Sequence, residues 1–172
     1  MAVVAILPIQ PPKETTMLQF YVDYMDILAD LHSQIEEAVA DLPAEALDWS
    51  PGPEMNSITV LVVHLTGAER YWIGDVAGQD PSGRERAAEF RSSGLSAPAL
   101  IARLTASRAH AQGVLSHLRL DDLAQDRSSV RHPDRSFTVS FCLLHTLEHT
   151  GQHLGHIQMV RQLYLAQHPA QP

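Results

Sequence analysis

The sequence has a single cysteine, Cys142, and no long uninterrupted run of apolar residues. With one cysteine no intrachain disulfide can form, which excludes the disulfide-stapled scaffolds of small secreted proteins. The short apolar stretch at residues 2–7 has no basic residue before it and a proline directly after it. It is too short for a signal peptide or a membrane span. We therefore expect a cytoplasmic protein that does not associate with a membrane.

Basic residues are also scarce. The chain of 172 residues has 12 Lys and Arg against 20 Asp and Glu, which gives a formal net charge of −8. Proteins that bind nucleic acid neutralise phosphates with clustered basic side chains, so we expect no nucleic-acid partner. Hydrophobic residues, by contrast, make up 45% of the chain. This length and composition predict one ordinary globular domain.

Apolar residues recur at helical spacing in four long segments, and no segment shows the alternation of a strand. The predicted helices cover about residues 16–41, 56–74, 96–118 and 136–166. Asn56 or Ser57 and then Ser96 are suited to cap the second and third of these helices. A further short helical piece is expected from Arg84 to Phe90. The fold class is therefore all-α, a four-helix bundle with long inter-helix connections of roughly 10 to 20 residues.

The same pattern sets the expected domain limits. Residues 1–15, with three prolines, are predicted to be a flexible N-terminal arm. Residues 16–166 form the single bundle domain, and the polar residues 167–172 form a C-terminal tail.

The most distinctive pattern is a run of four histidines in the last predicted helix, His145, His149, His153 and His156. At about 100° per residue from His145, the other three lie near 40°, 80° and 20°. All four therefore share one narrow stripe, on the face that should point into the core. A buried imidazole needs a polar partner, and a metal ion is a suitable one.

His64 places another histidine in the middle of the apolar face of the second predicted helix. A lone histidine there is more often a core imidazole bonded to a hydroxyl or carbonyl. However, bundle metal sites are built from side chains on facing helices. His149 and His153 are about 6 Å apart along the helix axis, as are His145 and His149, and either spacing suits two cis ligands. The first pair lies nearer the centre of the inward face, which favours His64, His149 and His153 as the metal ligands.

This set of three histidines leaves coordination positions for water or substrate, as catalytic metal sites do. All-nitrogen ligation suits Zn²⁺, Ni²⁺ or Fe²⁺ and does not choose among them. His145 and His156 flank the pair about 16 Å apart, so they cannot share one ion. Each is a candidate for an outer-shell role, although a plain hydrogen-bonded histidine is an equally simple interpretation. Cys142 is interpreted as a small core residue rather than a nucleophile.

These residues resemble the DinB-like superfamily of four-helix bundles, which includes bacillithiol- and mycothiol-dependent S-transferases. The resemblance extends from about Met17 to Leu165. It rests on LDWSP at 47–51, SI at 57–58, HL at 64–65, ERYW at 69–72, EH at 148–149 and HLGHI at 153–157. Members commonly bind a divalent metal through one histidine of the second helix and an H-x₃-H pair of the last long helix. The resemblance therefore implies His64, His149 and His153 as ligands. His156 departs from the glutamine that many relatives have there.

Three functions are compatible with this sequence. The first is a metal-dependent enzyme of the thiol S-transferase type, in which the metal activates a low-molecular-weight thiol toward a small-molecule substrate. A variant is a metal-dependent hydrolase that uses bound water. The last is a non-catalytic metal- or ligand-binding bundle. We also expect a homodimer.

Overall fold

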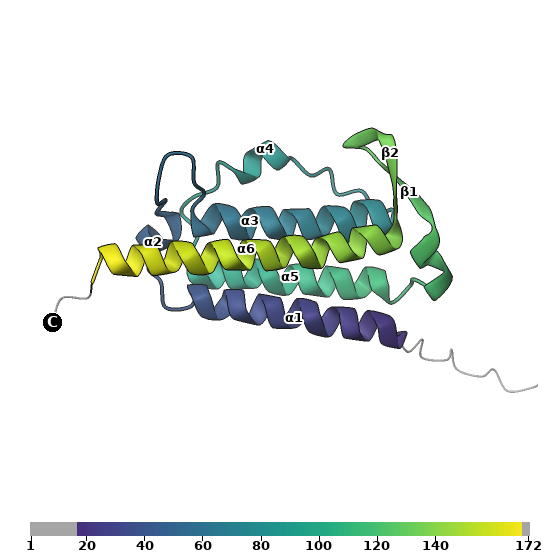
Figure 1. The fold of residues 1–172 in the computed structure, drawn as a ribbon, viewed down its shortest axis with the longest axis horizontal. Coiled ribbons are helices and arrows are strands. Elements are labelled where there is room, and N and C mark those ends of the chain that lie inside the picture. The colour runs from purple at the N-terminus through teal and green to yellow at the C-terminus, as the bar shows by residue number, and fades with distance from the viewer. Residues whose placement is uncertain (1–16, 170–172) are drawn as a thin grey trace, which may run out of the picture.

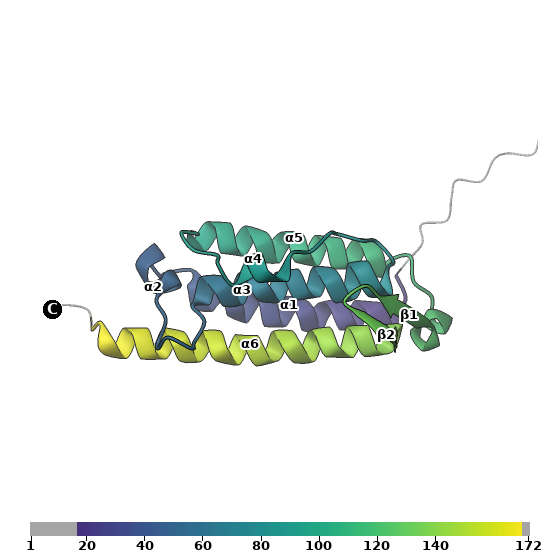
Figure 2. The same ribbon diagram turned by 90° about the horizontal axis from the view of Figure 1, so that it is seen from above.

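The computed structural model describes residues 17–169. The predicted N-terminal arm lies outside this range, as do the last three residues of the predicted tail. Four long helical segments lie side by side, as Figures 1 and 2 show. They are α1 (Gln19–Val39), α3 (Ile58–Glu69) with its continuation η1 (Arg70–Ala77), α5 (Ala97–Leu115) and α6 (Val139–Gln167). The predicted four-helix bundle is confirmed. No helix within 17–169 is long and apolar enough to cross a membrane.

Side-chain caps set where three of these helices begin. The Ser57 hydroxyl accepts a hydrogen bond from the Val60 amide at 3.3 Å, and the Ser96 hydroxyl accepts one from Ala99 at 3.4 Å. Both caps agree with the prediction, and each satisfies an amide that has no partner within the helix. The last helix begins three residues later than predicted because Thr138, rather than a residue near Ser136, caps it.

The connections carry short elements of their own. α2 (Ala44–Asp48) follows α1. α4 (Arg86–Glu89) confirms the predicted short helical piece. Figure 2 shows α4 lying over α3, with α5 on one side of α3 and α6 on the other. We call residues 79–95 the strap, because this connection crosses the outer side of α3 and so has one flank toward each of those two helices.

The prediction that the chain has no strand is wrong. After the 3₁₀ turn η2 (Leu120–Ala124), β1 (Asp126–Ser129) pairs antiparallel with β2 (His132–Thr138). The pair is hard to find in the sequence because β2 contains Pro133 and exposes five consecutive residues, so no apolar alternation develops. Only Phe137 and Ser129 are buried, and they anchor the hairpin to the end of the bundle.

The second predicted helix also changes its winding. From Arg70 the chain continues as a π-helix, in which the Gly78 amide donates to the Ile73 carbonyl at 2.8 Å. The wider turn makes the angular step smaller than the 100° assumed for an α-helix. As a result Tyr71 points to the hairpin, where its hydroxyl lies 2.5 Å from the Ser129 hydroxyl. The neighbouring Trp72 packs against both Phe137 of the hairpin and His145 of α6.

A polar cluster, which we call the Glu69 network, lies inside the bundle. The Glu69 carboxylate is 1% exposed. It accepts hydrogen bonds from His32 Nε2 at 2.8 Å, the Ser107 hydroxyl at 2.5 Å and the Thr150 hydroxyl at 2.8 Å. These residues come from α1, α3, α5 and α6, so one carboxylate connects all four long helices. No pattern in the sequence grouped His32 with another residue.

Candidate metal centre

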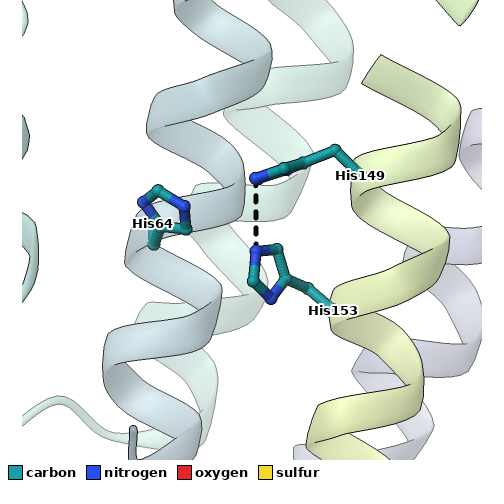
Figure 3. Close-up of side chains that lie close together, drawn as sticks. All are labelled: His64, His149 and His153. Carbon is teal, nitrogen blue, oxygen red and sulfur yellow. Dashed lines mark hydrogen bonds between the residues drawn. The ribbon is translucent and has the colours of Figure 1, made fainter. Parts of the chain in front are cut away.

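The structure brings together the three histidines predicted as ligands. Each of His64, His149 and His153 has a ring nitrogen within 4.8 Å of the corresponding atoms of the other two. The Nε2 atoms of His149 and His153 are 3.2 Å apart, and the His64 ring centroid is 5.2 Å from each of theirs. Figure 3 shows the three rings meeting between α3 and α6. This arrangement could hold one metal ion, although metal binding itself stays a prediction.

The local structure explains why these rings meet. α3 is buried along nearly its whole length, and His64 is only 7% exposed. α6 packs against α3 and presents His149 and His153 one helical turn apart on the same face. Two helices therefore define the positions of all three rings, and helices hold a site more precisely than loops do.

His64 has a partner that the sequence did not reveal. Its Nδ1 lies 2.9 Å from Glu89 Oε2, and Arg84 bonds both carboxylate oxygens through Nε at 2.5 Å and Nη2 at 2.8 Å. Burial opposes ionisation of Glu89, but the bonds from Arg84 and His64 outweigh it and hold the pKa of this carboxyl below its ordinary value. An ionised carboxylate only accepts, so His64 Nδ1–H donates and Nε2 keeps the lone pair that a metal requires.

Gly67 makes room for this carboxylate on α3. A Cβ at position 67 would overlap Glu89 Oε1 and crowd Arg84 Nε. Gly67 lies one turn after His64, so the strap can approach α3 closely enough for Glu89 to reach the imidazole. The predicted helical piece at Arg84–Phe90 had the correct local structure. Periodicity could not show, however, that this piece folds back over His64.

The two histidines of α6 are suited to donate lone pairs at neutral pH. Burial, followed by the neighbouring His153 and His64, lowers the pKa of His149 to about 3. Burial and His64 likewise lower the pKa of His153 to about 4. Both rings are therefore uncharged at pH 7, and neutral imidazole is the form that binds metals.

The two flanking histidines occupy different surroundings. His156 Nδ1 lies 3.3 Å from His153 Nδ1, so it contacts a predicted ligand directly. His145 bonds the exposed Glu148 at 3.1 Å and stacks on Phe141, with its ring 5.8 Å from that of His149. An outer-shell role for either residue stays a prediction.

Aromatic side chains form a wall on the His145 side of the cluster. The Trp72 ring meets His145 edge-on at 5.0 Å between centroids and stacks against His132 of the hairpin at 6.2 Å. Phe137 packs against Trp72, and Phe90 lies 4.9 Å from the His64 ring. Aromatic side chains of both the hairpin and the strap therefore lie beside the histidines.

Cys142 is a core residue, as predicted. It is 0% exposed, and burial raises the pKa of its thiol to about 12. The thiolate is the nucleophilic form of cysteine, and this thiol does not ionise near neutral pH. Any sulfur nucleophile used at this site must therefore come from another molecule.

Comparison with known proteins bears on the family and the fold of this chain. The family model for mycothiol-S-transferase matches residues 24–166. Among solved structures, the fold is similar to a conserved protein from Enterococcus faecalis, with a TM-score of 0.67 and 17% identity over 87% of this chain and 99% of that one. It is also similar to a DinB-like protein from Bacillus cereus, with a TM-score of 0.65 and 13% identity over 87% of this chain and 93% of that one. A comparison with curated proteins finds no match.

Proposed function

The chain belongs to the mycothiol-S-transferase family, and we propose on this premise that it is a metal-dependent enzyme that activates a low-molecular-weight thiol. His64, His149 and His153 would hold the metal. The observation that carries the proposal is the convergence of three imidazoles from two facing helices, with ring nitrogens within 4.8 Å of one another.

The donor set suits a divalent ion that accepts nitrogen ligands. Three neutral nitrogens favour Zn²⁺, Ni²⁺ or Fe²⁺, and a set of three protein ligands is typical of catalytic rather than structural sites. When bound, the ion would lower the pKa of a thiol and keep its sulfur as thiolate. A low-molecular-weight thiol is a small molecule, in agreement with the small-molecule substrate expected from the sequence.

The chain's own residues would perform the remaining tasks. Glu89 and Arg84 fix the direction of His64 Nε2. Trp72, which contacts both Phe141 and His145, would form an apolar wall on the His145 side of the site. In the transfer, sulfur forms a bond to the electrophilic carbon and the leaving group departs with the bonding electron pair. The thiol proton passes to water or to an imidazole beside the cluster, for which His145 and His156 are the candidates.

The test compares metal-loaded and metal-free protein. Each form is incubated with 1-chloro-2,4-dinitrobenzene and one of four thiols: mycothiol, bacillithiol, glutathione or cysteine. We expect a thioether product with at least one thiol, only in the metal-loaded form. The His64→Ala variant should lose both metal and turnover, whereas His117→Ala, at an exposed position just after α5, should keep both.

Other outcomes would point elsewhere. Stoichiometric metal without turnover for any thiol would favour the non-catalytic bundle, and ester hydrolysis without added thiol would favour the hydrolase. An unchanged metal content in His64→Ala would remove the site itself. The homodimer expected from the sequence is checked separately by light scattering of the eluting protein.

A further inference from the structure

Three aromatic rings meet one another beside the candidate metal centre. They belong to Trp72 of η1 and to Phe141 and His145 of α6. The ring centroids are 5.0 Å apart for Trp72 and His145, 5.6 Å for Phe141 and His145, and 5.9 Å for Trp72 and Phe141. We call these three side chains the aromatic platform. The His145 ring lies 5.8 Å from that of His149, so a molecule on the platform would lie beside the histidine cluster.

The platform keeps flat ring surface open to solvent. Phe141 is 40% exposed, and the side chain of His145 is 29% exposed. The Phe141 and His145 rings are nearly parallel, with 16° between their planes. The Trp72 plane stands at 85° to His145 and at 69° to Phe141. A flat ligand can therefore stack on one of these surfaces and meet another edge-on, which are the two preferred arrangements of aromatic rings.

Trp72 adds a hydrogen-bond donor at its exposed edge. Its side chain is only 9% exposed, yet the indole N–H has no acceptor within residues 17–169. This N–H is not fully enclosed, so it reaches solvent. A tryptophan as buried as this one usually pairs its N–H with an acceptor. The open donor favours a ligand that brings an oxygen acceptor, such as a carbonyl or nitro group.

The opposite side of the cluster, beyond His156, has different chemistry. A cavity of about 230 Å³ lies there, and Glu54, Asn56 and His156 line it among apolar residues. These three side chains offer hydrogen-bond partners to the polar groups of a low-molecular-weight thiol. The body of the thiol is therefore better suited to the His156 side, which leaves the platform for the other reactant.

We propose that the aromatic platform binds the electrophile, and that this electrophile carries an aromatic ring with an oxygen acceptor. Its identity as the electrophile rests on the proposed function, whereas the binding of such a ring does not. Phe141 is then a specificity-determining residue, because it contacts the ring of the substrate. The platform takes no part in the bond changes, in which sulfur bonds to carbon and the leaving group departs with the bonding electron pair.

Benzamide is a suitable probe, and cyclohexanecarboxamide is its saturated counterpart with the same amide group. The full-length, metal-free, ¹⁵N-labelled protein has two indole N–H signals, which the Trp49→Phe variant assigns. Benzamide should shift the Trp72 signal saturably, with a dissociation constant of about 5 mM for a ligand of this size. Trp49, which packs on Tyr164, is the internal reference and should not shift. Cyclohexanecarboxamide should bind about two- to tenfold more weakly, since it cannot stack.

Matched variants distinguish stacking on the platform from other binding. Phe141→Leu keeps an apolar side chain and removes the ring, so it should weaken benzamide binding about two- to tenfold and leave cyclohexanecarboxamide binding unchanged. Phe20→Leu, at an equally exposed phenylalanine of α1, should change neither. Equal benzamide binding by these two variants would overturn the proposal, as would the absence of a saturable Trp72 shift. So would a dimer that dissociates in Phe141→Leu, because a second copy of the chain would then cover the platform.

Turnover separates the platform from the thiol chemistry. In the metal-loaded protein, Phe141→Leu should lower kcat/KM for 1-chloro-2,4-dinitrobenzene about two- to tenfold. The same variant should leave kcat/KM unchanged for iodoacetamide, which has no ring. Turnover of iodoacetamide without benzamide binding would overturn the platform and support the proposed function. Benzamide binding without turnover of any electrophile would support the binding site and overturn the proposed function, and with it the identity of the occupant as an electrophile.

Discussion

At the scale of single residues, the direction of His64 depends on a carboxylate 25 positions later in the chain. The Glu89 carboxylate accepts from Nδ1–H and is itself held by two bonds from Arg84, so the ring cannot turn without breaking its charge-assisted bond to Glu89. Carboxylates that orient a metal-binding histidine raise its basicity and fix its tautomer. Glu89 is therefore a positioning residue for the proposed site, and its removal should affect metal binding.

We predict that Glu89→Ala lowers the affinity for Zn²⁺ by about 10- to 100-fold, the usual effect of losing such a partner. The measurement is competition with a chromophoric chelator at pH 7. Glu85→Ala is the matched control, because Glu85 lies on the same strap but is exposed and makes no bond to His64. Equal affinities of the two variants would show that Glu89 does not orient the ligand.

The sequence predicted the three histidines because each stands at a helical position whose face can be calculated. His149 and His153 differ by one turn, and His64 interrupts an apolar face, so the helix geometry alone brings them inward. Glu89 could not be predicted because its position depends on how the strap crosses α3. The Glu69–His32 pair could not be predicted for a related reason. Which residues of two helices face each other depends on their rotation and offset, and these follow from the packing of the whole bundle.

At the scale of helices, the Glu69 network is a contact among all four long segments. The carboxylate is buried and accepts three hydrogen bonds, which compensate for the loss of water. If His32, Ser107 and Thr150 lost this acceptor, their donors would have neither water nor protein as a partner. The full desolvation cost of these donors would then destabilise the fold. A bundle with another relative rotation of its helices would incur that cost, so the network favours the observed packing over alternatives.

Glu69→Gln tests this role with little change in side-chain volume. An uncharged amide cannot replace all three accepted bonds, and we expect the free energy of unfolding to fall by about 1–3 kcal/mol. The measurement is urea denaturation followed by circular dichroism. Glu37→Gln on the exposed face of α1 should change stability by less than about 0.5 kcal/mol. A loss in Glu69→Gln no larger than in this control would contradict the role of the network.

Two helix caps followed from the sequence, but the Thr138 cap, the hairpin and the π-helix did not. Ser57 and Ser96 cap helices through local bonds, which a local pattern can reveal. The hairpin gains its burial from Phe137 packing on Trp72, a residue more than 60 positions earlier in the chain. The π-helix likewise depends on its surroundings, since Tyr71 bonds Ser129 of the hairpin and Trp72 packs against both the hairpin and α6. Both features result from tertiary contacts between residues far apart in the chain, so no short stretch of sequence contains the information that predicts them.

At the scale of the whole molecule, the two uncharged histidines of α6 make the metal-free protein sensitive to acid. Burial lowers the pKa of His149 to about 3 and that of His153 to about 4, from an ordinary value of 6.5. At pH values between the lowered pKa of each folded ring and 6.5, the unfolded chain binds protons that the folded protein does not. Above pH 6.5 both states leave these two rings unprotonated, and the folded protein has its full stability. As the pH falls toward 4, protonation of the unfolded chain progressively lowers the free energy of unfolding.

For the metal-free protein we predict that the free energy of unfolding decreases from pH 6.5 to pH 4. The dependence should correspond to the uptake of up to about two protons on unfolding, and less where water screens the half-buried rings. Urea denaturation in the presence of a chelator at a series of pH values measures it. The double variant His149→Gln, His153→Gln carries no titrating group at either position, so its curve should be flatter than the wild-type curve by the same amount. Because every other titrating group is common to both proteins, parallel curves would mean that the two imidazoles are protonated equally in the folded and unfolded states.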